Sequence, residues 1–280
     1  MTTTRPTVAD KRRTFARLHE SGCFALPNPW DVGSARYLET LGFKALATTS
    51  SGFAWSKGFR DNAISRDMAL AHLHEMVVAT DLPVNADFEG GFAADPAGVE
   101  ESVGLAVATG VAGLSIEDST GNADAPLHAI DTAVARIRAA RRAIDRAGGD
   151  ALLVGRAECF LVGRPDLAET IARLKAYAQA GADCLYAPGL RARDDIAAVV
   201  AAVAPKPVNL LVGAASELTL SDIAALGVRR VSVGGALARA AWTGFMRAAQ
   251  TLAKDGRFDG FAGIVGGGEL NGLFREGPGT

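Results

Sequence analysis

The sequence predicts a single-domain (β/α)8 barrel, and three observations lead to this prediction. Eight short apolar runs recur about every 30 residues, the length of one strand–helix unit. Each run is continuously apolar, as expected for a strand that is buried on both faces. Ala-rich segments with helix signals separate the runs. Because no change in composition divides residues 1–280, we expect one domain that ends in a short Gly-rich tail over residues 256–280.

The predicted strands follow the apolar runs in order. They cover residues 23–27, 45–49, 83–86, 113–116, 152–155, 184–187, 208–212 and 230–233. Asp95 and Pro96 are typical of a helix start, since proline fits the first turn, and Gly110 ends that helix. A further helix is expected after Asp195 and a short one over 219–226. These alternating elements favour a barrel of parallel strands.

A doubly wound sheet is the alternative architecture. That fold favours a Gly-rich phosphate-binding turn after its first strand. The corresponding turn here, residues 27–31, contains no such glycines and ends in Asp31, which we interpret as a helix N-cap. The barrel is therefore the preferred prediction.

Composition argues against several classes of partner. The net charge is −2, and we find no Lys/Arg stripe with interleaved aromatic residues, so nucleic acid is not expected. Residues 1–13 are polar and do not resemble a signal peptide, and no apolar run has the length of a membrane span. The cysteines, Cys23, Cys159 and Cys184, show no disulfide pattern. We therefore expect a cytoplasmic protein without a membrane partner.

Two acidic clusters follow neighbouring predicted strands. Asp87 comes after the third strand and Glu117 after the fourth, so both should face the same mouth of the barrel. Asn85 precedes Asp87 by two residues and shares its side of the strand. These oxygen donors predict a site for Mg²⁺, with Mn²⁺ as an alternative, and not for zinc. Glu89 and Asp118 are interpreted as ordinary loop acids.

Two further polar residues belong to predicted strands. Arg156 ends the fifth strand, and its planar guanidinium suits a substrate carboxylate or phosphate. A buried ion pair with Glu158 is the other interpretation, and the two are compatible. Asn209 lies within the seventh strand, either as a polar group facing the mouth or as a satisfied amide inside the barrel.

Small residues after two other strands are candidates for substrate binding. Ser50, Ser51 and Gly52 follow the second strand, where backbone N–H groups could approach an anion. Gly234 follows the last strand, at the position where many barrels bind phosphate. A packing turn is an equally good interpretation of Gly234.

Seven short motifs also follow one another along the chain. They are Pro29-Trp30-Asp31, Ser51-Gly52, Gly58-Phe59-Arg60-Asp61, Asn85-Ala86-Asp87, Ile116-Glu117-Asp118, Arg156-Ala157-Glu158 and the segment 230–234. In this order and at these strand ends, the motifs resemble those of the isocitrate lyase/phosphoenolpyruvate mutase superfamily over nearly the whole chain.

The resemblance implies a (β/α)8 barrel whose last helix is exchanged between the subunits of a homodimer or homotetramer. It implies substrates that are small 2-oxo or 2-hydroxy carboxylic acids and a reaction through an enolate. Asp87 and Glu117 would hold Mg²⁺ largely through water. Asp61 on a mobile loop, Arg156 and Glu117 would be catalytic residues. Backbone amides of Ser51 and Gly52 would bind the substrate carboxylate.

The sequence departs from this superfamily in four segments. Glu89-Gly90-Gly91 replaces Gly-Tyr-Gly, where Glu89 is a candidate for restoring a charge to the metal shell, and Arg156-Ala157-Glu158 replaces Arg-Thr-Asp. Residues 119–126 contain no cysteine where the lyases place their general acid, and Asn85 replaces an aspartate. The leading hypothesis is therefore a magnesium-dependent carbon–carbon lyase for an oxaloacetate-like or 2-oxoglutarate-like acid, with slow or no cleavage of isocitrate. Phosphonopyruvate mutase or hydrolase chemistry and a non-catalytic 2-oxo acid binding protein remain alternatives. His128 and Cys159 are further candidates for the proton donor.

The last long helical segment, residues 237–252, predicts self-association. It carries Trp242, Phe245 and Met246 among alanines and leucines. This is more apolar surface than an outer helix of a monomer needs. We therefore expect a homo-oligomer that buries this helix.

Overall fold

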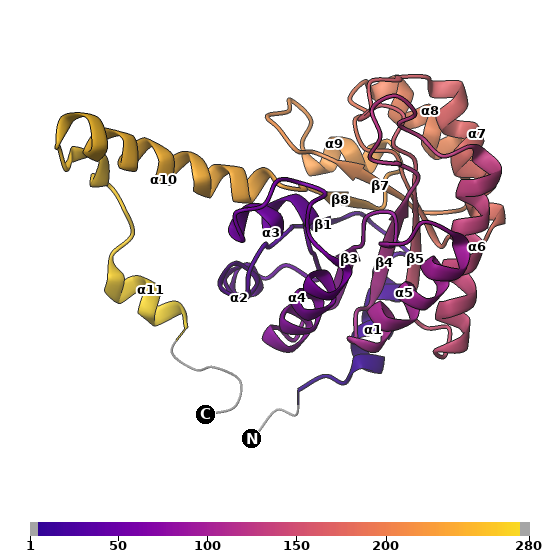
Figure 1. Cartoon of the computed structure of the whole chain (residues 1–280), viewed down its shortest axis with the longest axis horizontal. Coiled ribbons are helices and arrows are strands. Elements are labelled where there is room, and N and C mark those ends of the chain that lie inside the picture. Colours follow the sequence, from indigo (N-terminus) through magenta and orange to yellow (C-terminus); the bar gives the residue numbers. More distant parts are fainter. Residues whose placement is uncertain (1–4, 275–280) are drawn as a thin grey trace.

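The computed structural model describes residues 5–274 and confirms the barrel (Figure 1). Eight parallel strands pair in the order β1-β8-β7-β6-β5-β4-β3-β2. The strands are β1 (Phe24–Leu26), β2 (Leu46–Ala47), β3 (Val84–Asp87), β4 (Gly113–Glu117), β5 (Leu152–Arg156), β6 (Cys184–Tyr186), β7 (Val208–Leu211) and β8 (Arg230–Ser232). The helices are α1 (Val8–Leu18), α2 (Val32–Thr40), α3 (Ser50–Ser56), α4 (Arg66–Ala79), α5 (Pro96–Ala108), α6 (Ile130–Arg146), α7 (Leu167–Gln179), α8 (Arg193–Val203), α9 (Leu220–Ala225), α10 (Ala236–Asp255), the 3₁₀ turn η1 (Asp259–Phe261) and α11 (Gly267–Leu273).

The barrel is held together where β1 meets β2. At this seam the N–H of Ala47 donates to the carbonyl oxygen of Pro27 at 3.0 Å. The side chain of Asn28 adds three contacts. Its amide donates to the carbonyl oxygen of Thr48 at 2.8 Å, and its oxygen accepts the N–H groups of Val233 and Gly234, each at 2.9 Å. One buried amide therefore links the chain after β1 to β2 and to the loop after β8.

Helix starts largely follow the signals in the sequence. Asp95 caps α5 and Asp31 caps α2, as predicted, because each carboxylate accepts a backbone N–H of the first turn. The start of α8 differs from the prediction. This helix begins at Arg193, so Asp194 and Asp195 lie inside its first turn instead of before it. Acidic residues are also favourable there, since the helix dipole is positive at the N-terminus.

The inside of the barrel is small, closed at one end and partly polar. Phe15 of α1 packs against Leu26 and closes the end of the barrel opposite the mouth. Asn85, Asn209 and Arg230 are also buried inside the barrel, each at most 3% exposed. The main apolar core lies instead between the strands and the outer helices. The barrel interior can therefore hold polar contacts and a cavity.

Among residues 5–274, no helix occupies the usual place of the eighth outer helix of a regular barrel. Figure 1 shows α10 running away from the barrel. Ala238 is its only buried residue, whereas Phe245 is 62% exposed and Met246 is 50% exposed. An apolar groove of about 510 Å³ remains beside β1 and β8, and residues of α2 and α9, including Tyr37 and Leu220, line it. After α10 the predicted tail forms η1 and α11, and residues 275–280 lie outside the described part of the chain.

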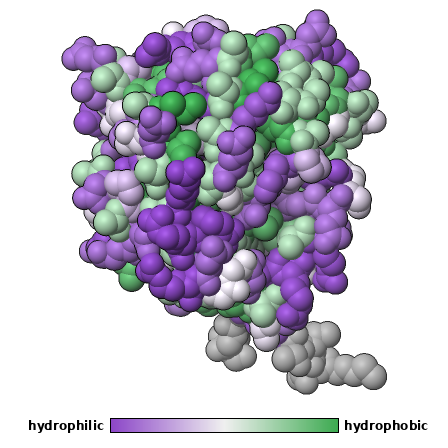
Figure 2. Space-filling view, turned by 90° about the vertical axis from the view of Figure 1, so that its right-hand side faces the viewer, coloured by the Kyte–Doolittle hydropathy of each residue, from purple (hydrophilic) through white to green (hydrophobic). Residues whose placement is uncertain are grey.

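The outer helices have the polar surface expected of a barrel rim. Figure 2 shows the right-hand side of Figure 1, where α6 and α7 lie; hydrophilic side chains gather on its lower half, and hydrophobic ones are mixed among them towards the top. In α6, Ile137 and Ile144 are buried against the sheet, whereas Arg138 is exposed. Within residues 5–274, no helix combines the length and the apolar character needed to cross a membrane.

Packing between β5 and α7 predicts the effect of one substitution. A Cβ atom on Gly155 would lie 2.8 Å from the Tyr177 Cβ and 3.2 Å from the Ala182 Cβ. We expect Gly155→Ala to lower the free energy of unfolding by about 1–3 kcal/mol, because neither atom can move away cheaply.

Gly104→Ala is the matched control. Gly104 lies in α5, and no described atom comes within 4 Å of the corresponding Cβ position. Alanine should raise the free energy of unfolding there by about 0.5–1 kcal/mol through its helix propensity. Urea denaturation measures both variants. Wild-type stability of Gly155→Ala would contradict the close packing.

Candidate active site

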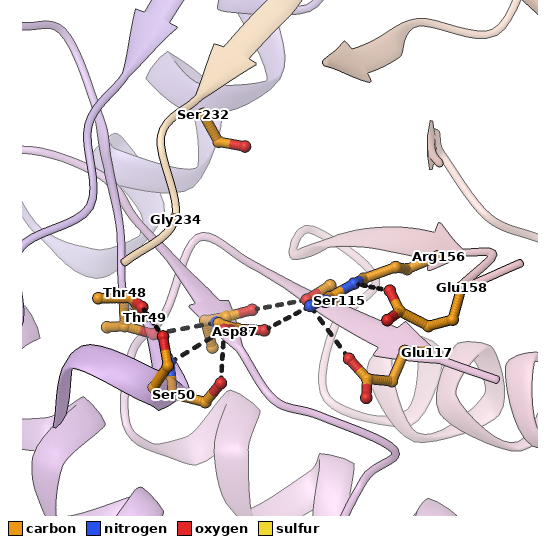
Figure 3. Close-up of polar contacts among 12 residues, drawn as sticks. Thr48, Thr49, Ser50, Asp87, Ser115, Glu117, Arg156, Glu158, Ser232 and Gly234 are labelled. Atoms are coloured by element: carbon orange, nitrogen blue, oxygen red, sulfur yellow. Dashed lines mark hydrogen bonds and ion pairs between the residues drawn. The ribbon is translucent and has the colours of Figure 1, made fainter. Parts of the chain in front are cut away.

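The side chain of Arg156 joins three carboxylates at the mouth of the barrel. Its Nη1 atom lies 3.1 Å from Asp87 Oδ1 and 3.0 Å from Glu117 Oε2, and its Nε atom contacts Glu158 Oε1 (Figure 3). All four side chains are less than 20% exposed. The predicted convergence of Asp87 and Glu117 is thus present, and the guanidinium of Arg156 lies between them.

Burial and charge determine how these groups ionise. Burial lowers the pKa of Arg156, but the charges of Glu117, Glu158 and Asp87 outweigh it and raise this pKa well above its usual value. Arg156 therefore stays cationic. Burial raises the pKa of Glu117, and the Arg156 charge offsets this only in part because further acids lie nearby.

Asp87 is held by the start of α3 as well as by Arg156. Its Oδ2 atom accepts the N–H and the hydroxyl of Ser50, both at 2.9 Å (Figure 3). The backbone N–H of Asp87 donates to the hydroxyl of Thr48, also at 2.9 Å. Ser50, a predicted substrate-binding residue, therefore contacts Asp87 and fixes its carboxylate.

The neighbouring residues form a tightly packed turn at the edge of the mouth. The Ser51 and Thr49 hydroxyl oxygens are 3.1 Å apart, and the N–H of Gly52 donates to the Thr49 hydroxyl at 3.3 Å. A Cβ on Gly52 would lie 2.7 Å from Thr49 Cγ2, 3.0 Å from the Trp30 Cβ and 3.2 Å from the Ala238 Cβ. Gly52 therefore allows α3 and α10 to approach each other, and its N–H is used within the turn.

Glu89 is part of the same acidic group. It follows β3 with a positive φ of 47° and is half-buried. Its Oε1 atom is buried and has no hydrogen-bond partner among the described residues. Burial, together with the charges of Asp87 and Asp61, raises the pKa of Glu89 to about 8. This burial beside Asp87 disagrees with an ordinary loop acid and agrees with the other possibility, that Glu89 restores the charge lost at Asn85.

Asp61 completes the acidic group from the loop between α3 and α4. Its side chain is exposed at the rim of the mouth, yet partial burial of the carboxyl group and the charge of Asp87 raise its pKa. The oxygen donors that could hold a hard cation are therefore Asp61, Asp87, Glu89 and Glu117. Within residues 5–274, no three His, Cys, Asp or Glu side chains are grouped tightly enough to hold a metal by themselves.

Asn85 and Asn209 lie deeper in the barrel than this acidic group. Asn85 accepts from Arg230 Nη1 at 3.3 Å and donates to the carbonyl oxygen of Ala86 at 3.1 Å. Asn209 accepts from Arg230 Nε at 2.9 Å and donates to the Ser232 hydroxyl at 2.9 Å. The structure thus does not bring Asn85 to Glu117, contrary to the expected convergence. Of the two interpretations of Asn209, the satisfied amide inside the barrel is the one observed.

A cavity of about 180 Å³ lies between these groups. Its polar lining near the mouth includes Ser50, Ser51, Asp61, Asp87, Arg156 and Gly234. Tyr186 also lines it, with its ring centroid 5.3 Å from the Arg156 Cζ atom, and burial raises the pKa of this phenol to about 12. The lining residues do not include Cys159 or His128. The N–H of Gly234 donates to the Asn28 side chain.

Asp118 supports the site from behind. It is 2% exposed, and its Oδ1 atom accepts the backbone N–H of Glu158 at 2.8 Å. Its Oδ2 atom accepts from Arg173 Nη1 at 3.0 Å and from the hydroxyl of Tyr177. Asp118 therefore has a structural role, a buried salt bridge with Arg173. It holds the segment after β5, which carries both Glu158 and Arg156.

Known proteins share this fold and much of this sequence. Residues 15–253 match the phosphoenolpyruvate phosphomutase family. An oxaloacetate decarboxylase from Paraburkholderia xenovorans is 31% identical over 234 residues, which make up 81% of this chain and 75% of that protein. Among solved structures, a lyase/mutase-like protein from Burkholderia cenocepacia is 50% identical, with a TM-score of 0.93 and coverage of 96% of this chain and 98% of that one.

A more distant structure has a bound ligand. Oxaloacetate acetylhydrolase in complex with its product oxalate is 26% identical, with a TM-score of 0.83 and coverage of 95% of this chain and 94% of that one. These matches, together with the barrel and the strand-end motifs, identify the family. The chain belongs to the phosphoenolpyruvate phosphomutase family, within the phosphoenolpyruvate mutase/isocitrate lyase superfamily.

Proposed function

We propose that this protein is a magnesium-dependent carbon–carbon lyase that decarboxylates a small, oxaloacetate-like 2-oxo acid through an enolate. The observation that carries the proposal is the excess of acid at the mouth, where Asp87, Glu117 and Glu158 share the single guanidinium of Arg156 and Glu89 has an unpartnered oxygen. The names of two relatives, oxaloacetate decarboxylase and oxaloacetate acetylhydrolase, support the substrate class.

The acidic group fits a hydrated divalent cation. Mg²⁺ prefers oxygen ligands and usually keeps several waters, which agrees with carboxylates too far apart to enclose a metal by themselves. Asp61, Asp87, Glu89 and Glu117 would hold it, and the buried Glu89 Oε1 would gain a partner. When bound, Mg²⁺ supplies the positive charge that stabilises an enolate. We propose Glu89, in place of Asn85, as the additional member of this group.

The protein residues would position the substrate and control its protonation. Arg156 is fixed by Glu158 and by packing against Tyr186, so it keeps the Asp87 and Glu117 carboxylates in place. The hydroxyl of Ser51 lines the cavity and could donate to a substrate carboxylate. The cavity of about 180 Å³ favours a small acid over a tricarboxylate.

The available proton donors favour decarboxylation over cleavage of isocitrate. Loss of CO₂ from oxaloacetate breaks the C3–C4 bond and leaves its electron pair in the enolate of pyruvate, which then takes one proton at C3. Cleavage of a 2-hydroxy tricarboxylate needs, in addition, a base that removes the hydroxyl proton. Among the described residues, no Cys or His lines the cavity, whereas Tyr186 does. Decarboxylation needs only one proton transfer, whereas cleavage of isocitrate needs a base as well, so these residues suit decarboxylation better.

Phosphonate chemistry receives less support. It would use the turn after β8 to bind a phosphonate group, but the N–H of Gly234 donates to the Asn28 side chain at 2.9 Å. A lyase is therefore the preferred function, and the reaction products distinguish it from a phosphonate enzyme.

We also propose that the protein is a homodimer or homotetramer in which α10 lies against a neighbouring copy. The apolar groove beside β1 and β8 occupies the usual place of an eighth outer helix. The exposed Trp242, Phe245 and Met246 of α10 could fill the groove of a second subunit. Burial of both surfaces would remove exposed apolar area from water.

The first prediction concerns the metal. Glu89→Gln should weaken Mg²⁺ binding at least about 10-fold, since a neutral amide replaces a charged ligand. Isothermal titration calorimetry with MgCl₂ measures this, with Asp124→Asn as the control because Asp124 is exposed in the loop of residues 119–126. Equal Mg²⁺ affinity of Glu89→Gln and the wild type would refute the proposed role of Glu89.

The second prediction concerns the reaction. With Mg²⁺, the wild type should convert oxaloacetate to pyruvate and CO₂ at about 1–1,000 per second, after subtraction of the rate seen with Asp87→Asn. Isocitrate should yield little or no glyoxylate. Oxalate and acetate as products would instead indicate a hydrolase, and conversion of phosphonopyruvate would indicate phosphonate chemistry. Saturable oxaloacetate binding without turnover would indicate a binding protein.

The third prediction concerns assembly. Light scattering at micromolar concentration should give the mass of a dimer or tetramer. The double variant Phe245→Glu, Met246→Glu should dissociate, because two charges would have to be buried in an apolar groove. Gln250→Glu, which adds charge at an exposed polar position of the same helix, should stay associated. A monomeric wild type would contradict the exchange of α10.

A further inference from the structure

A buried cation without an acidic partner lies beneath the candidate metal site. Arg230 is the first residue of β8, is 2% exposed, and lines the same cavity as Asp87 and Arg156. Because β8 runs towards the mouth, Arg230 lies at the opposite end of this strand, on the floor of the cavity. No Asp or Glu raises its pKa; burial lowers this pKa, and only Cys184 and Tyr186 act in the other direction.

Arg230 has hydrogen-bond contacts only with neutral groups among the described residues. Its Nε atom donates to Asn209 at 2.9 Å, and its Nη1 atom lies 3.3 Å from Asn85 Oδ1 and 3.4 Å from His19 Nε2. His19 Nδ1 donates to the carbonyl oxygen of Phe15 at 2.8 Å, so Nε2 is free to accept. Burial and the Arg230 charge lower the pKa of His19 to about 3, so this ring is uncharged. Nη2 makes no hydrogen bond to a described residue.

A buried guanidinium normally has a counter-charge. Arginine stays protonated in proteins, and removing its charge from water is costly unless an anion accompanies it. Arg156, in the same cavity, contacts three carboxylates. Arg230 has none, although the two arginines are both almost fully enclosed. The floor of the cavity therefore carries one positive charge that the described side chains leave uncompensated.

The surroundings of Arg230 provide space and a second donor. Leu26, Ala47 and Ser115 also line the cavity, and two of these three side chains are small. The Ser232 hydroxyl oxygen accepts the Asn209 amide, and its O–H can donate either to the neighbouring Tyr186 phenol or to a bound acceptor. Ser232 lines the cavity as well. The cavity thus offers a guanidinium at its floor and, two residues further along β8, a hydroxyl on its wall to one small acceptor.

We infer that the floor of the barrel cavity is a binding site for one small anion, held by Arg230 and Ser232. The ligand chemistry is that of a single compact negative charge, which could be a free halide such as chloride or the far carboxylate of a substrate. The site is formed by β7 and β8, and it does not require a metal at the mouth.

Crystallography with bromide tests the site directly. Crystals of the wild type grown in sodium bromide should show an anomalous peak within hydrogen-bond distance of the Arg230 guanidinium and the Ser232 hydroxyl. The peak should be absent from crystals of Arg230→Gln. Absence of the peak from the wild type overturns the inference.

Thermal unfolding tests whether the anion matters in solution. At fixed ionic strength, replacing gluconate with chloride should raise the melting temperature of the wild type by several degrees and leave Arg230→Gln unchanged. Arg229→Gln is the matched control: it removes the same charge one residue earlier, from a half-buried side chain that contacts the carbonyl oxygen of Gly22, and it should keep the chloride effect. If Arg230→Gln does not fold, the wild type and Arg229→Gln still decide the matter.

Two further outcomes complete the test. A bromide peak without any chloride-dependent stabilisation indicates an adventitious ion only, and it overturns the inference. Inhibition kinetics then separate the two sources of the anion. Competition between chloride and oxaloacetate assigns the site to a substrate carboxylate, whereas stabilisation without competition assigns it to a resident halide. The bromide crystals and the thermal unfolding do not require turnover. They would therefore still support the anion site if the proposed reaction were not observed.

Discussion

The contacts of a single guanidinium organise the mouth of this barrel. Arg156 of β5 reaches Asp87 of β3 and Glu117 of β4, so it ties the ends of three neighbouring strands together. Glu158 fixes the guanidinium, and the buried Asp118 in turn holds the backbone of Glu158. Because one positive charge serves three carboxylates, and Glu89 and Asp61 lie close by, the site is left with an excess of negative charge. That excess is what a divalent cation would neutralise.

Much of the fold could be predicted from the sequence because its signals are local. Each strand is a short apolar run, and caps such as Asp31 and Asp95 act within their own first turn. Asp87 and Glu117 were predictable for a related reason, since both end a strand and the fold alone brings strand ends together. No local signal in the sequence indicates that α10 leaves the barrel, although the apolar residues of this helix predicted association.

The rest of the site depends on partners that are distant in the sequence. Asn85 is a plausible metal ligand by its spacing, but its actual partner, Arg230, comes 145 residues later. The local sequence of Asp118 does not reveal its partner, the hydroxyl of Tyr177, which lies 59 residues later in the chain. The role of Glu89 stayed open in the sequence for another reason. Both Asn85 and Glu89 lie two residues from Asp87, and spacing alone does not decide between them.

The account requires a metal and an oxo acid to meet at the same acidic group. The most direct measurement is a crystal structure of the wild type with Mn²⁺ and oxalate, a stable planar mimic of the pyruvate enolate. We predict an anomalous Mn²⁺ peak among Asp61, Asp87, Glu89 and Glu117, with oxalate bound to the metal inside the cavity that Arg156 lines. Oxalate bound without a metal, or Mn²⁺ bound away from these carboxylates, would contradict the account.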